Sequence, residues 1–198
     1  MSEILPYILS VFIGIGLSAA AGFRVFLPMF IVSLSTYFGW IPLNESFTWL
    51  SGLPALITTG VATVVEIAAY YIPYIDNILD TISIPLATVA GSVLFASQYV
   101  DVGTFSQWAL ALIAGGGTAA TIATGFAGTR AASTTTTGGI GNNLVATTET
   151  AGASFMSIVA LALPIIAFII AIGLIILTFV MGRKIWTKIR NNKKSIEI

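Results

Sequence analysis

The chain has 198 residues, of which 57% are hydrophobic and 8% are charged, and its formal net charge is zero. Soluble domains carry about 25% charged residues, so this composition excludes a soluble globular protein and indicates one whose surface faces lipid. The absence of cysteine and histidine excludes disulfides, thiolate nucleophiles, imidazole bases and the metal sites built from those side chains.

Six long stretches contain no charged residue, and each is long enough for a bilayer-crossing helix, which needs about 20 apolar residues. They cover residues 4–23, 25–44, 46–65, 81–100, 102–129 and 150–182. The sequence therefore predicts an all-α, polytopic transmembrane helix bundle with about five or six spans. We expect residues 1–198 to form a single transmembrane domain.

The first expected span covers residues 5–23. The amino end lacks the basic region of a signal peptide, so we expect this span to be retained. After Arg24, an apolar segment runs to Tyr37 and contains Pro28. It is too short to cross a bilayer alone, so it is either a half-helix or a kinked continuation.

Residues 38–53 combine tryptophans with turn-forming residues, which is typical of a loop at the membrane surface. A second span is expected at residues 54–72 and contains Glu66. Residues 73–80 are expected to form an acidic turn, and residues 82–99 a third span.

The fourth expected span, residues 107–127, is rich in Gly, Ala and Thr, so we expect it to pack inside the bundle. In residues 131–148, 12 of 18 residues are Ser, Thr, Gly or Asn and none is charged; we expect irregular structure there. The last expected span, residues 150–181, is too long for one straight crossing, and we expect a kink at Pro164.

Six of the eight basic residues lie in the tail, residues 182–198. The positive-inside rule then places the carboxyl end in the cytoplasm, and we expect a multi-pass protein of the cell (inner or plasma) membrane. A basic tail next to a span usually marks topology, so we expect no nucleic-acid partner.

An internal duplication is indicated when Arg24 is aligned with Arg130. Both arginines end an Ala-Gly-x-Arg motif, and each is followed later by a glutamate, Glu66 or Glu149, in a Val-Ala-Thr context. The predicted repeats are residues 5–100 and 106–181. An odd number of spans in each would make the repeat inverted, as in many transporters. One observation argues against the duplication: the arginine and the glutamate are 42 residues apart in the first half and 19 residues apart in the second.

Arg24, Glu66, Arg130 and Glu149 all occur in apolar or uncharged surroundings. An unpaired charge there costs at least about 2.5 to 3.5 kcal/mol, so these residues are expected to pair. They would form two internal salt bridges, or a network around an aqueous cavity in which a substrate temporarily replaces one partner. The alternative for each arginine is a helix end from which its side chain reaches the membrane surface.

The tract at residues 134–143 offers hydroxyls, amides and glycine backbone without fixed charge, which suits a dehydrated solute or ion. Thr136, Asn142 and Asn143 are its candidate ligands. The alternative is an extramembrane Thr-rich loop.

Asp76 and Asp80 are four residues apart and could share one helical face as ligands of a divalent cation. Two carboxylates without a third ligand do not define a metal site, so we favour a surface turn. An intramembrane aspartyl protease or a metal-dependent transferase is the minor enzyme hypothesis, and no cofactor is expected.

Residues 20–28, 124–134 and 142–149 resemble a family of prokaryotic integral membrane proteins catalogued as a domain of unknown function. The likeness extends over residues 5–180, and the arginine-bearing segments are its most specific parts. It implies a helical membrane domain and no particular activity.

We therefore expect a small membrane transporter or channel for an anionic or polar small solute, in which Arg24 and Arg130 bind the solute while Glu66 and Glu149 balance or couple it. A lipid-phosphate flippase or scramblase is the first alternative, because paired arginines also suit a phosphate headgroup. A non-transporting assembly protein is the second, with small residues serving helix packing alone. The expected partners are membrane lipid, a small solute or ion, and further copies of the chain in a homo-oligomer.

Overall fold

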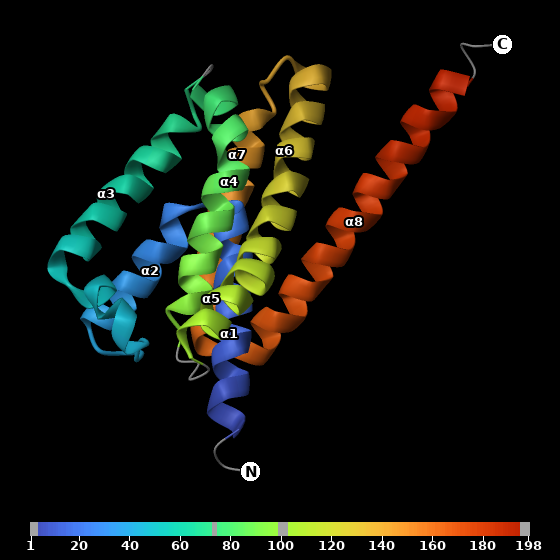
Figure 1. Cartoon of the computed structure of the whole chain (residues 1–198). Helices are drawn as coiled ribbons and strands as arrows, with labels where there is room; N and C mark the ends of the chain where they lie inside the picture. Colours follow the sequence, from blue (N-terminus) through green and yellow to red (C-terminus); the bar gives the residue numbers. More distant parts are fainter. Residues whose placement is uncertain (1–3, 73–74, 99–102, 195–198) are drawn as a thin grey trace.

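The structure is a computed structural model that describes residues 4–72, 75–98 and 103–194. Within these ranges every regular element is a helix (Figure 1), so the predicted all-α fold is confirmed. The elements are α1 (Ile4–Phe23), α2 (Phe26–Tyr37), η1 (Glu45–Ser51), α3 (Leu53–Ala69), α4 (Ile75–Ala96), α5 (Thr104–Leu110), η2 (Ala111–Gly116), α6 (Gly117–Thr137), α7 (Asn142–Ala162) and α8 (Pro164–Lys194).

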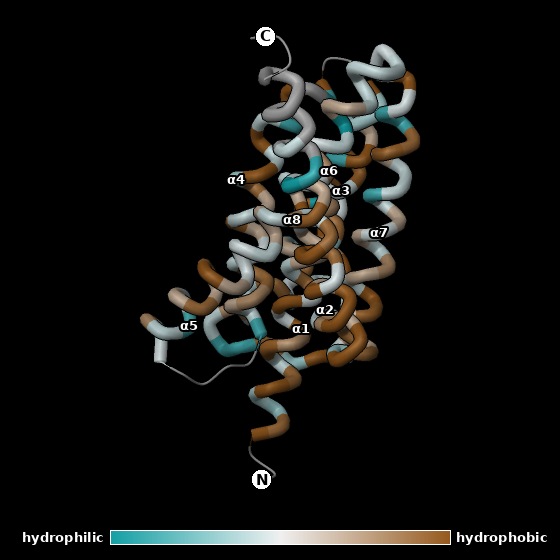
Figure 2. Tube along the Cα trace, turned by 90° about the vertical axis from the view of Figure 1, so that its right-hand side faces the viewer, coloured by the Kyte–Doolittle hydropathy of each residue, from teal (hydrophilic) through white to brown (hydrophobic). Residues whose placement is uncertain are grey.

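Five of the described helical stretches are long and apolar enough to cross a membrane, and a sixth is obtained if η1 and α3, bent by 65° at their junction, count as one span. This agrees with the predicted five or six spans and indicates a multi-pass membrane protein. Hydrophobic residues dominate the half of the bundle around α1 and α2, nearer the N-terminus (Figure 2).

Helix α1 is the centre of the bundle and packs against α4, α6, α7 and α8. Small residues allow this close packing. A Cβ atom added to Gly22 would lie 2.7 Å from the Cβ of Ile122, and one added to Gly91 would lie 2.5 Å from the Cβ of Ala119. Ser18 on α1 donates a hydrogen bond to the Gly91 carbonyl at 2.8 Å. Small residues thus serve helix packing in this bundle, as expected in a membrane protein.

The chain reverses direction between α1 and α2, immediately after Arg24 (Figure 1). Helix α2 has 12 residues, so the half-helix alternative was right. The break lies before Pro28 rather than at it. Pro28 occupies the first turn of α2. Backbone N–H groups in a first turn have no acceptor within the helix, so a proline there removes no helical hydrogen bond.

Two predicted irregular regions are helical instead. The acidic turn at residues 73–80 was wrong, because α4 begins at Ile75 and includes both aspartates; residues 73–74 lie outside the described ranges. The Thr-rich region is also mostly helical, since α6 continues to Thr137 and α7 begins at Asn142. Helices satisfy every backbone group in an apolar medium, and threonine hydroxyls bond to carbonyls of their own helix.

The predicted single kinked span at residues 150–181 is also wrong. Helix α7 ends at Ala162, α8 begins at Pro164, and the two helices run in opposite directions (Figure 1). Proline at the first position of α8 is compatible with a helix start and not with continuation of α7. The basic tail begins within α8, which stays helical to Lys194.

The inverted repeat is not confirmed by the helix directions. The arginine-bearing segments, α1 and α6, run in the same direction, whereas the glutamate-bearing helices, α3 and α7, run in opposite directions (Figure 1). A single inversion therefore does not relate both pairs, and the duplication stays a prediction.

Candidate functional site

The four charged residues singled out in the sequence are all buried. Arg24 follows the last residue of α1, Glu66 lies on α3, Arg130 on α6 and Glu149 on α7. The side chains of Arg24 and Arg130 are 0% and 4% exposed, so neither arginine extends to the membrane surface. The alternative that each arginine lies at a helix end and reaches the membrane surface is therefore wrong for both arginines.

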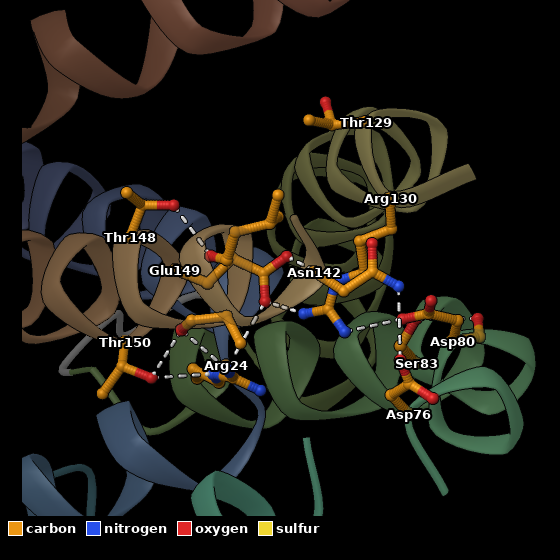
Figure 3. A network of polar contacts seen from close by, with 12 residues as sticks. Arg24, Asp76, Asp80, Ser83, Thr129, Arg130, Asn142, Thr148, Glu149 and Thr150 are labelled. Atoms are coloured by element: carbon orange, nitrogen blue, oxygen red, sulfur yellow. Dashed lines mark hydrogen bonds and ion pairs between the residues drawn. The ribbon is translucent and has the colours of Figure 1, made fainter. Parts of the chain in front are cut away.

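Arg130 is the residue that joins most helices at this site. Its Nε donates to Glu149 Oε1 at 3.0 Å, its Nη2 pairs with Glu149 Oε2, and its Nη1 donates to Asp80 Oδ1 at 2.9 Å. One guanidinium therefore connects α6 to α7 and to α4 through charge-assisted bonds. Figure 3 shows Arg130 between its two carboxylate partners.

Arg24 approaches Glu149 from the other side (Figure 3). Its Nη2 lies 3.6 Å from Glu149 Oε2 and donates to the Ala146 carbonyl at 2.8 Å, while its Nε donates to Thr150 Oγ1 at 3.2 Å. Its Nη1 is buried without a hydrogen-bond partner. Glu149 is thus the shared counter-charge of two arginines. Arg24, Arg130, Glu149 and Asp80 are called the ionic network below.

Tyr70, the residue after α3, contacts both arginines. The Cζ atoms of Arg24 and Arg130 lie 4.0 and 3.9 Å from the centroid of its ring. Each cation–π contact of this kind contributes about 0.5 to 2 kcal/mol, with the larger value where water is excluded. Tyr70 was not among the predicted site residues, and only its place one helical turn after Glu66 could have pointed to it.

Glu66 does not form the predicted salt bridge. Its Oε1 accepts the Val25 N–H at 2.8 Å and its Oε2 accepts the Phe26 N–H at 3.0 Å. These groups belong to the first turn of α2, where backbone N–H groups lack intrahelical acceptors and the helix dipole favours a negative charge. Glu66 is therefore a cap supplied from another helix, and it fixes the chain reversal that follows Arg24.

The two aspartates of α4 have polar partners in this region. Asp80, expected on a surface turn or at a metal, is instead a partner of Arg130. Asp76 accepts a hydrogen bond from Asn142 Nδ2 at 3.3 Å, and the same nitrogen donates to Thr134 Oγ1 at 3.0 Å. In the described part of the chain, no group of three or more carboxylates is placed to hold a metal ion.

Of the three predicted ligands in the Thr-rich tract, the structure brings one close to the ionic network. Asn142 is buried and bonds to Asp76, whose own helix carries Asp80. Thr136 and Asn143 are exposed, and the Thr136 hydroxyl donates to the Ala132 carbonyl of its own helix. The irregular backbone that would have freed these groups for a solute does not form.

A cavity adjoins the ionic network. Its free space is about 20 Å³, enough for roughly one water molecule, and its polar wall consists of Glu66, Tyr70, Asp80, Ser83, Arg130 and Glu149. Its remaining lining is apolar and comes mainly from α1 and α6. Polar groups that converge from several helices are one feature of a small-molecule site, and a solute larger than water would have to displace side chains to enter.

The charges of the ionic network balance. Two guanidinium groups face two carboxylates, Glu149 and Asp80, while the charge of Glu66 is directed at the N-terminus of α2. Removing one partner of a buried pair typically costs about 3 to 5 kcal/mol. A solute that displaces one of these charged groups from its partner must therefore carry a charge of the same sign.

Comparison with known proteins identifies a family and no activity. No curated protein and no solved structure matches the chain. The family described as "Domain of unknown function (DUF4126)" matches residues 11–184, which is most of the chain. The chain therefore belongs to this family, whose description names no activity.

Proposed function

We propose that the protein is a small membrane transporter or channel for an anionic or polar small solute. The observation that carries the proposal is the ionic network: four charged side chains from the α1 end, α4, α6 and α7 meet in a buried region beside a cavity. Charged groups inside a membrane protein are costly and commonly mark a substrate or ion pathway.

Arg130 is the proposed primary binding residue. A small anion that enters the cavity replaces Asp80 at Nη1, so the guanidinium keeps a negative partner throughout. Because the Arg130–Asp80 contact connects α6 to α4, this exchange removes one of the contacts that hold these two packed helices together. Binding at the network thereby becomes coupled to helix movement, which a carrier requires.

Arg24 is the proposed second binding residue. Its Nη1 has no hydrogen-bond partner, so both N–H groups of this atom are available to a solute oxygen. Arg24 does not itself line the cavity, so the solute would have to move past Tyr70 or Glu149 to reach it. Glu149 keeps the two arginines in one network and balances their charge. Glu66 serves by holding α2 and the chain reversal, which positions Arg24.

Stopped-flow light scattering of proteoliposomes tests the proposal with a panel of candidate solutes. Vesicles are shrunk by a sudden excess of the potassium salt of chloride, nitrate, formate or phosphate, with valinomycin present so that K⁺ accompanies the anion, or by an excess of glycerol or urea. The rate of reswelling reports entry of each solute. We expect protein-dependent reswelling for at least one solute, and its loss in Arg130→Gln. The matched control is Arg183→Gln, because Arg183 is exposed on α8.

The proposal fails if reswelling never exceeds that of empty vesicles, or if Arg130→Gln and Arg183→Gln proteins behave alike. Reconstituted protein is quantified for each variant, so that a difference in insertion is not taken for a difference in flux.

A lipid-phosphate flippase or scramblase is the second candidate. It is favoured by an apolar groove between α3 and α4 that shares Glu66 and Tyr70 with the cavity. Translocation of a fluorescent phospholipid, followed by dithionite quenching in the same vesicles, distinguishes it from solute transport. An assembly protein would give neither signal and would instead co-purify with a stable partner in detergent.

The membrane orientation and the oligomeric state belong to the same proposal. Arg183 and the basic residues after it support a cytoplasmic carboxyl end in the cell membrane. A homo-oligomer is the expected assembly. Because the chain has no cysteine, one cysteine introduced at Lys194 reports orientation by its accessibility to a membrane-impermeant maleimide.

A further inference from the structure

Helices α3 and α4 do not pack against each other along their lengths. Helix α3 contacts mainly α2 and η1, and Figure 1 shows it standing apart from α4, with α2 between the two helices in this view. Between α3 and α4 lies a groove with about 180 Å³ of free space. Its lining is formed by Val25, Phe26, Ala62, Val65, Glu66, Ala69, Tyr70, Leu79, Ile82, Ser83 and Leu86.

The groove opens to the side of the bundle. Val65 on α3 and Ile82 and Leu86 on α4 line it and are also exposed on the outer surface. Both helices have the composition of membrane spans, α3 in its bent pair with η1. The mouth of the groove therefore faces the hydrocarbon region of the bilayer rather than water.

The chemistry of the lining decides what can fill the groove. Water requires two to four polar partners at each position, and most of this lining is aliphatic or aromatic. Its polar members, Glu66, Tyr70 and Ser83, also line the cavity beside Arg130. The groove is therefore lined mainly by apolar side chains, and its inner wall is shared with the polar cavity beside Arg130.

The size of the groove favours a hydrocarbon chain over a helix of a second copy. A helix is about 10 Å wide and rises 5.4 Å per turn, so one turn fills roughly 420 Å³, and the groove, with about 180 Å³ of free space, would hold less than half of one turn. A methylene group is similar in size to a water molecule, which occupies about 30 Å³, so the groove holds roughly six such groups. That is a segment of one acyl chain, whose remaining groups stay in the bilayer.

We propose that the groove between α3 and α4 is a binding site for one acyl chain of a phospholipid from the surrounding bilayer. The chain lies between Val65 and Leu86, and its glycerol end is directed toward Tyr70 and Arg130. The site does not depend on the proposed solute transport, because it follows from the apolar lining, the size and the lateral opening of the groove.

Photolabelling in proteoliposomes tests the site. The full chain is reconstituted with a phosphatidylcholine that carries a diazirine on one acyl chain, illuminated without any solute gradient, and digested for mass spectrometry. We expect stronger labelling at Val65, Ile82 and Leu86 than at Ile176, which is exposed on α8. The proposal is overturned if the groove residues are labelled no more than α8.

Substitutions within α3 make the comparison specific. Ala62→Phe fills the groove and is expected to abolish labelling of the groove residues while leaving that of α8 unchanged. Ala68→Phe is the matched control, because Ala68 is exposed on the same helix and does not line the groove. Equal groove labelling in both variants would contradict the proposal. If Ala62→Phe does not reconstitute, Leu86→Phe narrows the groove from the opposite wall.

A second copy of the chain would give a different result. With a cysteine at Val65, a groove occupied by another protomer yields covalent dimers on oxidation, together with loss of lipid labelling. That outcome would replace the acyl chain with a protein neighbour and refute the proposal.

Discussion

Replacing Glu149 with glutamine is the most direct test of the ionic network, because the carboxylate of this residue contacts both arginines. It accepts from Arg130 Nε and pairs with Arg130 Nη2 and, at 3.6 Å, with Arg24 Nη2. The amide that replaces it would retain one acceptor oxygen but would present an NH₂ group to donors. Arg130 would keep Asp80 as a partner, whereas Arg24 would lose the carboxylate that now lies beside its Nη2.

Loss of one partner from a buried ion pair costs about 3 to 5 kcal/mol. For a chain of this size, each kcal/mol lowers the Tm by roughly 2 to 4 °C, so we expect a decrease of about 6 to 20 °C. Thermal unfolding in detergent, followed by the fluorescence of the four tryptophans, measures it. Glu45→Gln is the matched control, because Glu45 is exposed in η1, and we expect it to leave the Tm nearly unchanged.

A double variant distinguishes pairing from a general effect of the glutamine. Arg24→Gln combined with Glu149→Gln removes one charge of each sign and leaves Arg130 paired with Asp80. We therefore expect it to be less destabilised than the sum of the two single variants, with a coupling of about 0.5 to 3 kcal/mol. The reasoning is refuted if Glu149→Gln melts like Glu45→Gln, or if the two single effects simply add.

Three further substitutions test the other contacts. Glu66→Gln should weaken the cap on α2 by about 1 kcal/mol, seen as faster hydrogen exchange at its first turn; unchanged exchange there would contradict the capping role. Tyr70→Leu should destabilise the protein by about 1 to 4 kcal/mol through two lost cation–π contacts, whereas Tyr70→Phe should retain them; equal Tm values for the two variants would argue against these contacts. Gly22→Ala should cost about 1 to 3 kcal/mol by overpacking, while Gly173→Ala, with open space around it, should not destabilise; similar Tm values would contradict the close packing of α1.

The burial of the charged residues was predictable from the sequence, but most of their partners were not. Arg24, Glu66, Arg130 and Glu149 stand out because a charge in an apolar segment is costly enough to require a partner. Partner choice depends on which helices are adjacent, and that information is not contained in the spacing of residues along the chain. The opposite charges made a pair between Glu66 and an arginine a reasonable prediction. The first backbone N–H groups of α2, however, have no acceptor within the helix and compete for the same carboxylate.

The errors in the helix boundaries have a common physical origin. Residues 131–137 look like a loop because Thr and Ser favour turns and caps in water, where the free backbone can bond to solvent. Here α6 continues from its apolar part through these residues, and the hydroxyls of Thr135, Thr136 and Thr137 donate to carbonyls of the same helix instead of ending it. Asp76 and Asp80 were assigned to a turn for a similar reason, although partners on α6 and α7 allow them to lie within α4.

Glu66 and Tyr70 connect the polar and apolar parts of the molecule. They lie one helical turn apart at the end of α3, and both line the cavity as well as the groove. Displacing α3 would uncover the backbone N–H groups of Val25 and Phe26 and remove the aromatic ring from both guanidinium groups, so the movement is unfavourable unless other contacts replace these.

A solute anion at Arg130 would replace the contact of that guanidinium with the Tyr70 ring, whereas an acyl chain in the groove would pack against the opposite side of the same residues and stabilise α3 in its present position. Under the proposed function, the end of α3 is therefore the part of the molecule where occupancy of the solute site and of the lipid site influence each other. Because coupling between two ligands is reciprocal, a lipid that favours one position of α3 must change solute affinity by the same factor by which the solute changes lipid affinity.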